Sequence, residues 1–295
     1  MMMRWLIAAL PGHPLWLPTV LVMACLMNVE AQAQDGQAQD GSTPNPPAGS
    51  HQKQPDGAGF SGRLILGGLA VPDYEGSKDY SAAPIVAGRL SYDNYYIDLK
   101  GPKAKINLSP FAGFEFGPSI GLGSGRGSVK NDRVDDMHNI DDTIVGGAFV
   151  RVSTKKIILP ADELAFGVEV LTDLGGKHHG TTISFGPSYS FSPIAKVRLG
   201  VDISATYASG SYTNTFFGVD ASDAQRSGLS PYNAHGGIKD VGVMFNVTYQ
   251  WNKHWGITGI AGYKQLVGDA ADSPIVDKVG SAGQAIVGTG IVFKF

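Results

Sequence analysis

The sequence contains a single cysteine, Cys25, among its 295 residues. One thiol cannot form an intramolecular disulfide, so a disulfide-stapled fold is excluded. Charged residues make up only 17% of the chain, against roughly 25% in an ordinary soluble domain. The formal net charge is -3, and this balance lacks the broad cationic field that nucleic-acid binding needs. We therefore expect no nucleic acid as a partner.

Long apolar runs are also scarce. After the first residues no stretch approaches the ~18 consecutive apolar residues that a membrane-spanning helix needs, and the mean hydropathy is -0.02. Glycine is abundant, with 40 residues, but it lacks the three-residue period of collagen. No nucleotide-binding or nucleophile-elbow motif stands between a strand and a helix. We therefore expect neither a helical membrane protein nor a cofactor.

The beginning of the chain has the features of an export signal. Arg4 precedes the apolar run Leu15–Met27, and Ala31-Gln32-Ala33 supplies the small-x-small pattern of a signal-peptidase site. We predict a signal peptide over residues 1–33. A lipoprotein signal ending at Cys25 is the alternative.

The remaining chain divides by composition. Residues 34–59 are polar, with almost no large apolar side chains, and are predicted to form a disordered periplasmic tether. Residues 60–295 show strict alternation of apolar and polar side chains, which is typical of β-strands. In Lys239–Trp251 one face carries only large apolar side chains, namely Val241, Val243, Phe245, Val247, Tyr249 and Trp251.

The alternation favours a membrane barrel over a soluble β-protein. The segments are about ten to thirteen residues long, near the length of a tilted strand crossing a bilayer. Their polar faces are rich in Gly, Ser and Thr, and aromatic residues gather at the strand ends, as in the interfacial girdles of such barrels. We predict an all-β fold, a transmembrane antiparallel β-barrel in the outer membrane. A soluble β-sandwich is the alternative.

The joins between segments alternate between short and long, as expected when short periplasmic turns alternate with longer outer loops. Twelve strands are predicted, or ten if one segment is bent. The predicted segments are Phe60–Val71, Ala82–Tyr92, Tyr95–Lys100, Lys103–Ser109, Phe111–Ile120, Thr143–Ser153, Asp162–Thr172, Thr181–Phe191, Lys196–Tyr207, Lys239–Gln250, His254–Gln265 and Gln284–Phe295. The terminal Phe295, with apolar residues at every second position before it, resembles the signal recognised by the outer-membrane assembly machinery.

The inward faces of these strands carry charges of both signs. Such charges can close a small lumen by pairing, or line a narrow water path if they do not meet. A small-solute channel is therefore one candidate function. The predicted lumen charges are Arg89, Asp98, Lys100, Lys103, Lys105, Glu115, Arg151, Glu163, Glu169, Lys196, Arg198, Asp202 and Lys264.

Three stretches carry a family resemblance. The first is Val71–Tyr80, continued by Ala83–Val86. The second is Phe216–Val219, followed by Arg226–Leu229, and the third runs through Asp272–Lys278 to the closing strand. In this order they resemble the MltA-interacting protein (MipA)/OmpV family of Gram-negative outer-membrane proteins.

The resemblance implies a non-enzymatic scaffold in the outer membrane, in contact with lipid and lipopolysaccharide. The family's namesake is an adaptor that brings a lytic transglycosylase together with a bifunctional penicillin-binding protein at the peptidoglycan layer. Relatives of the OmpV type are linked to adhesion and stress response, which is an alternative role for this chain.

One loop could hold catalytic chemistry. An Asp/His group in an outer loop could activate water, which makes a barrel hydrolase a further alternative. A solvated acidic loop that binds divalent cations loosely is the simpler interpretation. The residues are Asp132, Asp135, Asp136, His138, Asp141 and Asp142.

Two other motifs are expected to have no catalytic or metal-binding role. His178 and His179 are adjacent, so their side chains diverge in an extended loop, and the chain lacks the spacing of a zinc site. The glycine-rich stretch Gly121–Gly127 is not followed by a predicted helix that could present amides to phosphate, and is expected to be a mobile loop. We assign no catalytic, cofactor-binding or metal-binding residue.

Overall fold

The structure is a computed structural model that describes residues 59–295. The predicted signal peptide with its cleavage site after Ala33, and the tether up to residue 58, lie outside the described residues. Within residues 59–295 the chain forms a closed antiparallel barrel in which the first strand pairs with the last. The predicted all-β barrel is thereby confirmed, and the β-sandwich alternative is wrong.

The barrel has twelve strands, as predicted. They are β1 (Phe60–Pro72), β2 (Tyr80–Tyr92), β3 (Tyr95–Lys100), β4 (Lys103–Asn107), β5 (Phe114–Gly123), β6 (Thr143–Lys155), β7 (Glu163–Asp173), β8 (Thr181–Ile194), β9 (Val197–Ala208), β10 (Gly237–Gln250), β11 (Trp255–Leu266) and β12 (Gly283–Lys294). The short β3 and β4 pair as separate antiparallel strands, so the ten-strand alternative is wrong.

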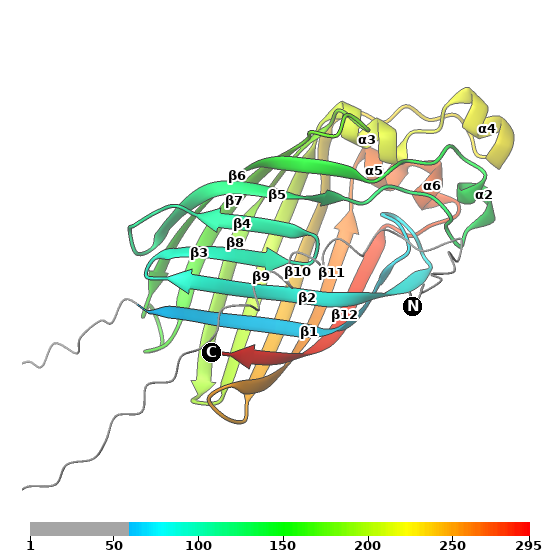
Figure 1. Cartoon of the computed structure of the whole chain (residues 1–295). Helices are drawn as coiled ribbons and strands as arrows, with labels where there is room; N and C mark the ends of the chain where they lie inside the picture. The colour runs from blue at the N-terminus through cyan, green and yellow to red at the C-terminus, as the bar shows by residue number, and fades with distance from the viewer. Residues whose placement is uncertain (1–58) are drawn as a thin grey trace, which may run out of the picture. The chain divides into compact units, whose positions relative to one another are not determined.

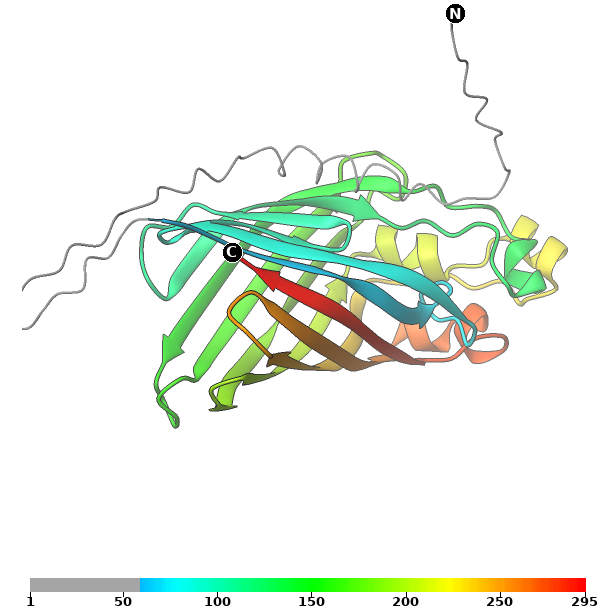
Figure 2. The ribbon, with the colours of Figure 1, turned by 60° about the horizontal axis from the view of Figure 1, so that its bottom comes forward.

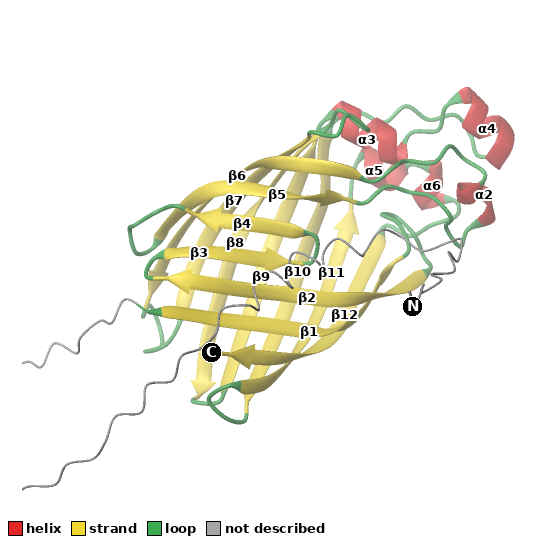
Figure 3. Ribbon diagram, in the orientation of Figure 1, coloured by secondary structure: helices red, strands yellow, loops and turns green. Residues whose placement is uncertain are grey.

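Short helices gather at one end of the barrel (Figure 1), and Figure 3 shows them in red against the yellow strands. They are α2 (Asp132–Asp135), α3 (Gly210–Phe217), α4 (Ala221–Ser227), α5 (Asp269–Asp272) and α6 (Pro274–Asp277). We call this end the loop end, and the opposite end, where Phe60 and Phe295 lie, the turn end. Among residues 59–295 no helix has both the length and the apolar character needed to cross a membrane.

The strand period sets which side chains face outward. On β10 the alternate residues Phe245, Val247 and Tyr249 are exposed on the outer surface, while Asn246 and Thr248 point to the lumen side of the same strand. On β12, Val287 and Ile291 are likewise exposed. A closed wall with its apolar face outside has no solvent-facing polar surface along its strands, so it suits lipid as its surroundings.

Most strands differ from their predicted bounds by one to three residues at an end, and one strand is displaced by three residues at both ends. The segment expected at Phe111–Ile120 is β5, Phe114–Gly123, shifted by three residues because Gly113 has a left-handed φ of 80° that turns the chain just before it. A Cβ at Gly117 would lie 1.9 Å from the carbonyl oxygen of Ile106. Glycine at this position therefore permits the close approach of β5 to β4.

The seam between β1 and β12 closes the wall, as Figure 2 shows. Arg63 to Ala70 pair in register with Lys294 back to Val287. At the turn end Gly62 N donates to Phe295 O at 2.9 Å, and Phe295 N donates back to Gly62 O at 3.1 Å. The terminal ring lies directly over Gly62, where a Cβ would be only 2.1 Å from it.

Candidate functional site at the two ends of the lumen

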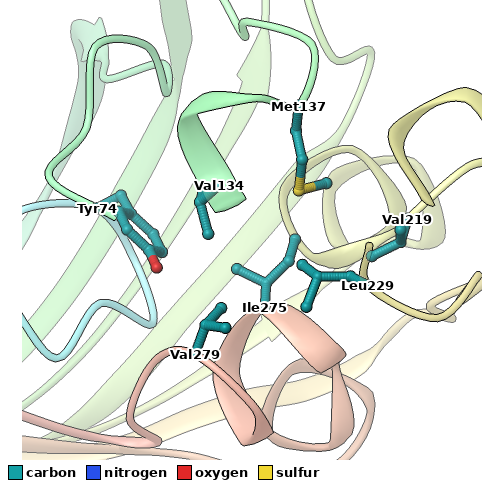
Figure 4. Packing of buried hydrophobic residues seen from close by; sticks show 7 residues of the cluster. All are labelled: Tyr74, Val134, Met137, Val219, Leu229, Ile275 and Val279. Carbon is teal, nitrogen blue, oxygen red and sulfur yellow. The ribbon is translucent and has the colours of Figure 1, made fainter. Parts of the chain in front are cut away.

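The outer loops fold together at the loop end. We call residues 73–79, 124–142, 209–236 and 267–282 the cap. A buried apolar cluster joins all four segments (Figure 4). Its members are Tyr74, Val134, Met137, Val219, Leu229, Ile275 and Val279. Full burial of such side chains contributes roughly 1.5–3 kcal/mol each, so the cap has a core of its own.

A second buried cluster ties the cap to the barrel. It includes Phe217 of α3 and Val276 of α6, which pack with Leu266 at the end of β11. Burial of the Tyr74 hydroxyl in the first cluster raises the pKa of that side chain to about 12. The loops therefore form a folded layer that packs onto the strand ends.

An ion-pair cluster lies beneath this layer. Lys239 is only 5% exposed, and its Nζ lies 2.7 Å from Asp240 Oδ2 and also contacts the Glu75 carboxylate. Tyr212 of α3 donates its hydroxyl to Glu75 Oε2 at 3.0 Å. A register shift between Ile238 and Asp240 interrupts the alternation, so neighbouring residues are both buried.

Nearby charges and burial shift the pKa values of two loop side chains, Glu75 and Tyr212. Burial acts to raise the pKa of Glu75, but the ammonium groups of Lys239 and Lys264 outweigh it and hold this pKa below its ordinary value. Burial and the nearby Glu75 carboxylate raise the pKa of Tyr212. The pair thus consists of an ionised carboxylate and a neutral phenol, which fixes α3 to the β1–β2 loop.

The predicted Asp/His loop does not assemble a catalytic group. Among residues 59–295, His138 makes no side-chain hydrogen bond to the other five residues, and its Nδ1 lies 2.5 Å from Oδ2 of the fully buried Asp223 on α4. Three of the acidic side chains have structural contacts. Asp135 Oδ1 accepts from Val129 N, Asp142 Oδ1 accepts from Gly125 N, and Asp141 pairs with Lys177.

Asp223 was not among the predicted residues, because it lies 85 positions from His138 and no local motif marks it. Together with Asp220 these residues place potential metal-ligand atoms within 4.8 Å of one another. Both Asp223 oxygens, however, already accept hydrogen bonds, from His138 N at 2.8 Å, from its ring, and from Arg226. These contacts fit a structural joint between α2 and α4 better than a metal centre.

The two adjacent histidines diverge, as predicted. His178 is buried with its ring against Tyr212 and Phe216, and its Nδ1 accepts from Gly180 N at 3.0 Å. Burial lowers the pKa of His178, so this imidazole packs as a neutral side chain. His179 lies on the exposed side of the same loop.

The expectation of a mobile loop at Gly121–Gly127 is wrong. Its first residues extend β5, and Arg126 forms an antiparallel bridge with Ile140. A Cβ at Gly125 would lie 1.9 Å from the Ile140 carbonyl oxygen. The glycines therefore allow two cap segments to approach closely.

Many of the predicted lumen charges meet along one wall. Arg89 Nε lies 3.0 Å from Asp98 Oδ1, and the Tyr96 hydroxyl donates to Glu115 at 2.6 Å. Arg151 then bridges Glu115, at 2.9 Å, to Glu163. We call this set the charge belt, namely Arg89, Tyr96, Asp98, Glu115, Arg151 and Glu163, and it runs from β2 to β7 near the turn end.

A second pair lies deeper in the lumen. Lys105 Nζ lies 3.0 Å from Glu169, which also accepts from Ser119 Oγ at 2.6 Å. Along this wall the charges therefore pair with one another, as in one of the two outcomes considered for the lumen. Among residues 59–295, the predicted lumen charges that form no ion pair include Lys103, Lys196, Arg198 and Asp202.

A hydrogen-bonded turn at the turn end joins β6 to β7 over residues 156–162. The Asp162 carboxylate accepts from the backbone N–H groups of residues 157, 158 and 159, each at 2.8 Å. It also accepts from the Tyr189 hydroxyl at 2.9 Å. Desolvation acts to raise the pKa of Asp162, but these donors lower it well below its ordinary value.

This turn presents apolar side chains outward from a fixed backbone. Ile158 is 77% exposed, with Ile157 and Leu159 beside it. Lys155 and Lys156 flank them and are exposed as well. We call residues 155–159 the turn knob. A rigid apolar and basic projection of this kind has little conformational entropy to lose when a partner binds.

Comparison with known proteins identifies relatives. A family model described as "MltA-interacting protein MipA" matches residues 64–295. Outer membrane protein OmpV of Vibrio cholerae is 36% identical over 90 residues, which are 30% of this chain and 33% of that protein. MltA-interacting protein of Escherichia coli is 31% identical over 80 residues, or 27% of this chain and 31% of that protein. The matched segments thus span about a third of these relatives.

Among solved structures, OmpT of Vibrio cholerae superimposes with a TM-score of 0.37 at 8% identity. The superposition covers 80% of this chain and 97% of that chain.

Proposed function

We propose that this chain, which belongs to the MltA-interacting protein (MipA) family, is a non-enzymatic platform that brings peptidoglycan-remodelling enzymes together. The chain is an outer-membrane β-barrel. In such barrels short turns face the periplasm and long loops face outward. The turn end accordingly faces the peptidoglycan layer, where those enzymes act.

The turn knob is the observation that carries this proposal. Large exposed aliphatic side chains on a rigid backbone provide the anchor residues that dominate protein–protein binding when they enter a partner's pocket. The three backbone hydrogen bonds to Asp162 hold Ile157, Ile158 and Leu159 in place before binding. The proposed partners are a lytic transglycosylase and a bifunctional penicillin-binding protein.

Affinity capture from cross-linked envelopes tests the proposal directly. The tagged protein should recover both classes of enzyme, and the double variant Ile157→Ser/Ile158→Ser should lose at least one of them. Leu174→Ser is the matched control, because Leu174 is also highly exposed, at 62%, but lies at the loop end. Capture by this control should equal that of the unaltered protein.

Two results would contradict the proposal. Recovery of no peptidoglycan enzyme by the unaltered protein would remove the platform function. Equal recovery by the unaltered protein and the Ile157→Ser/Ile158→Ser variant would remove the turn knob as its docking surface.

The alternative functions have weaker support. A small-solute channel needs a continuous path, whereas the cap packs onto the loop end and the charge belt pairs across β2 to β7. A barrel hydrolase needs Asp135, Asp136 and His138 to act together, whereas His138 pairs with Asp223 instead. Reconstituted bilayers that show conductance steps would favour the channel over the platform.

A further inference from the structure

The wall beside the charge belt, at β1 and β12, carries two cations that form no ion pair within residues 59–295. Lys294 of β12 lies directly opposite Arg63 of β1, and Arg63 lies directly opposite Arg89 of β2. Side chains directly opposite on neighbouring strands have Cβ atoms about 5 Å apart. Three positive charges therefore stand in a row on the lumen face near the turn end.

Only one member of this row forms an ion pair with a carboxylate within residues 59–295. Arg89 pairs with Asp98 of the charge belt, whereas neither Arg63 nor Lys294 forms an ion pair or a side-chain hydrogen bond within residues 59–295. Phe295 forms no ion pair with Arg63 or Lys294 within residues 59–295. Its carbonyl oxygen accepts a hydrogen bond from Gly62 N. Asp98 lies near enough to Arg63 to attract it, but Arg89 and Lys100 already contact that carboxylate. Like charges directly opposite one another are unfavourable, and the row carries more positive than negative charge.

A fourth cation faces the row from β9. Arg198 lies near enough to both Arg63 and Lys294 to repel them, and its guanidinium donates only to Ser190 Oγ, at 2.7 Å. The carboxylate of Asp202 lies four residues nearer the loop end on the same strand, roughly 13 Å away along the strand. The Glu163 carboxylate of the charge belt attracts Arg198, but Glu163 already forms ion pairs with Arg151 and Lys155.

A neutral polar group completes this part of the lumen. Gln250 ends β10 on the inward face, and both of its amide atoms are buried without a hydrogen-bond partner in the described part of the chain. Its side chain lies over Gly256 of β11, whose neighbour on β12 is Val292, two residues before Lys294. Because Arg63 and Arg198 are exposed, water and small solutes reach this region.

We propose that Arg63, Lys294 and Arg198 form an anion-binding site inside the turn end, which takes a small soluble oxyanion bearing carboxylate or phosphate groups. Guanidinium groups donate two parallel hydrogen bonds to either oxyanion, and an ammonium adds a point charge. Gln250 supplies a further donor. The cap covers the loop end, so the anion enters from the turn end.

Calorimetric titration of the full chain, folded in a neutral detergent, tests the site. Citrate and inorganic phosphate are the probes, and chloride at matched ionic strength is the reference. We expect saturable binding of one anion per barrel. Arg63→Gln/Lys294→Gln should weaken it by about tenfold or more, since each charged hydrogen bond is worth at least one such factor.

Two further variants keep the test decisive. Arg198→Gln removes an exposed side chain and should weaken binding even if the double variant does not fold. Lys177→Gln removes a cation from the loop end, where it pairs with Asp141, and should leave binding unchanged. A preference for citrate assigns the carboxylate class, and a preference for phosphate assigns the phosphate class.

The proposal is overturned if neither probe binds saturably, or if binding survives both Arg63→Gln/Lys294→Gln and Arg198→Gln. It does not depend on the turn knob, so failure of enzyme capture leaves it standing.

Discussion

The carboxylate of Asp223 and the imidazole of His138 join two loops of the cap through a 2.5 Å contact between Oδ2 and Nδ1. Asp223 is fully buried, and Arg226 shares its other oxygen. The segment that carries most of the predicted Asp/His residues is therefore held by an acid from a different loop, and its histidine makes a structural contact.

Replacement of Asp223 should loosen the cap without unfolding the barrel. Asp223→Ala leaves the His138 backbone N–H and the Arg226 guanidinium without their acceptor, at a cost of about 1–3 kcal/mol. Faster amide hydrogen exchange in residues 131–138 and 221–227 would show the effect. Asp132→Ala is the control, because that exposed side chain makes no hydrogen bond among residues 59–295, and unchanged exchange in Asp223→Ala would contradict the prediction.

Acidification should weaken the contact between Glu75 and Lys239. The folded-state pKa of Glu75 is depressed below its ordinary value of 4.5. Its contribution is therefore fully present above that value and is lost as pH falls through the depressed pKa. Urea midpoints measured between pH 3 and pH 7 should show a stability difference between the unaltered protein and Glu75→Gln that shrinks below pH 4.5. A difference that stays constant with pH would refute this assignment.

Loss of Asp162 should release the turn knob. Asp162→Ala removes the acceptor of three backbone hydrogen bonds, so trypsin should cleave after Lys155 and Lys156 several times faster in the folded barrel. Tyr189→Phe removes only one of the hydrogen bonds to Asp162. Trypsin should therefore cleave this variant nearly as slowly as the unaltered protein. Equal cleavage rates in all three proteins would mean that Asp162 does not order the turn.

Removal of Phe295 should impair insertion but not export. The deletion removes the reciprocal hydrogen bonds with Gly62 and the ring that covers it. The measurement is the fraction of exported protein that reaches the heat-modifiable folded form, which should fall. Phe295→Tyr keeps an aromatic ring and should retain normal assembly. Normal folding of the deletion would disprove the role given to the last residue.

The strands were predictable because alternation is local and is repeated along each segment. The alternation from Val241 to Tyr249 identifies β10 without reference to any other part of the chain. Where the alternation is interrupted, the sequence does not predict which side chains are buried. A bulge after Ile238 buries both Lys239 and Asp240, although alternation places them on opposite faces.

The lumen cations at the turn end illustrate a second limit. Arg63 was not predicted to face inward, because β1 carries aliphatic side chains on both faces, such as Leu64 and Ile65, so its period is ambiguous. The pairing of Arg63 with Lys294 and Arg89 places Arg63 on the lumen face. The cap could not be predicted for a different reason. The buried cluster that contains Tyr74 and Ile275 joins loops some 200 positions apart, and no periodic pattern in the sequence marks it.

The pairing of β1 with β12 has a consequence for biogenesis. The hydrogen-bonded row that completes the ring joins two segments that lie more than 200 positions apart in the sequence. Until β1 and β12 meet, the folding sheet has two open edges, which invite pairing with other polypeptides. A partly folded barrel therefore needs both edges shielded until these two strands pair.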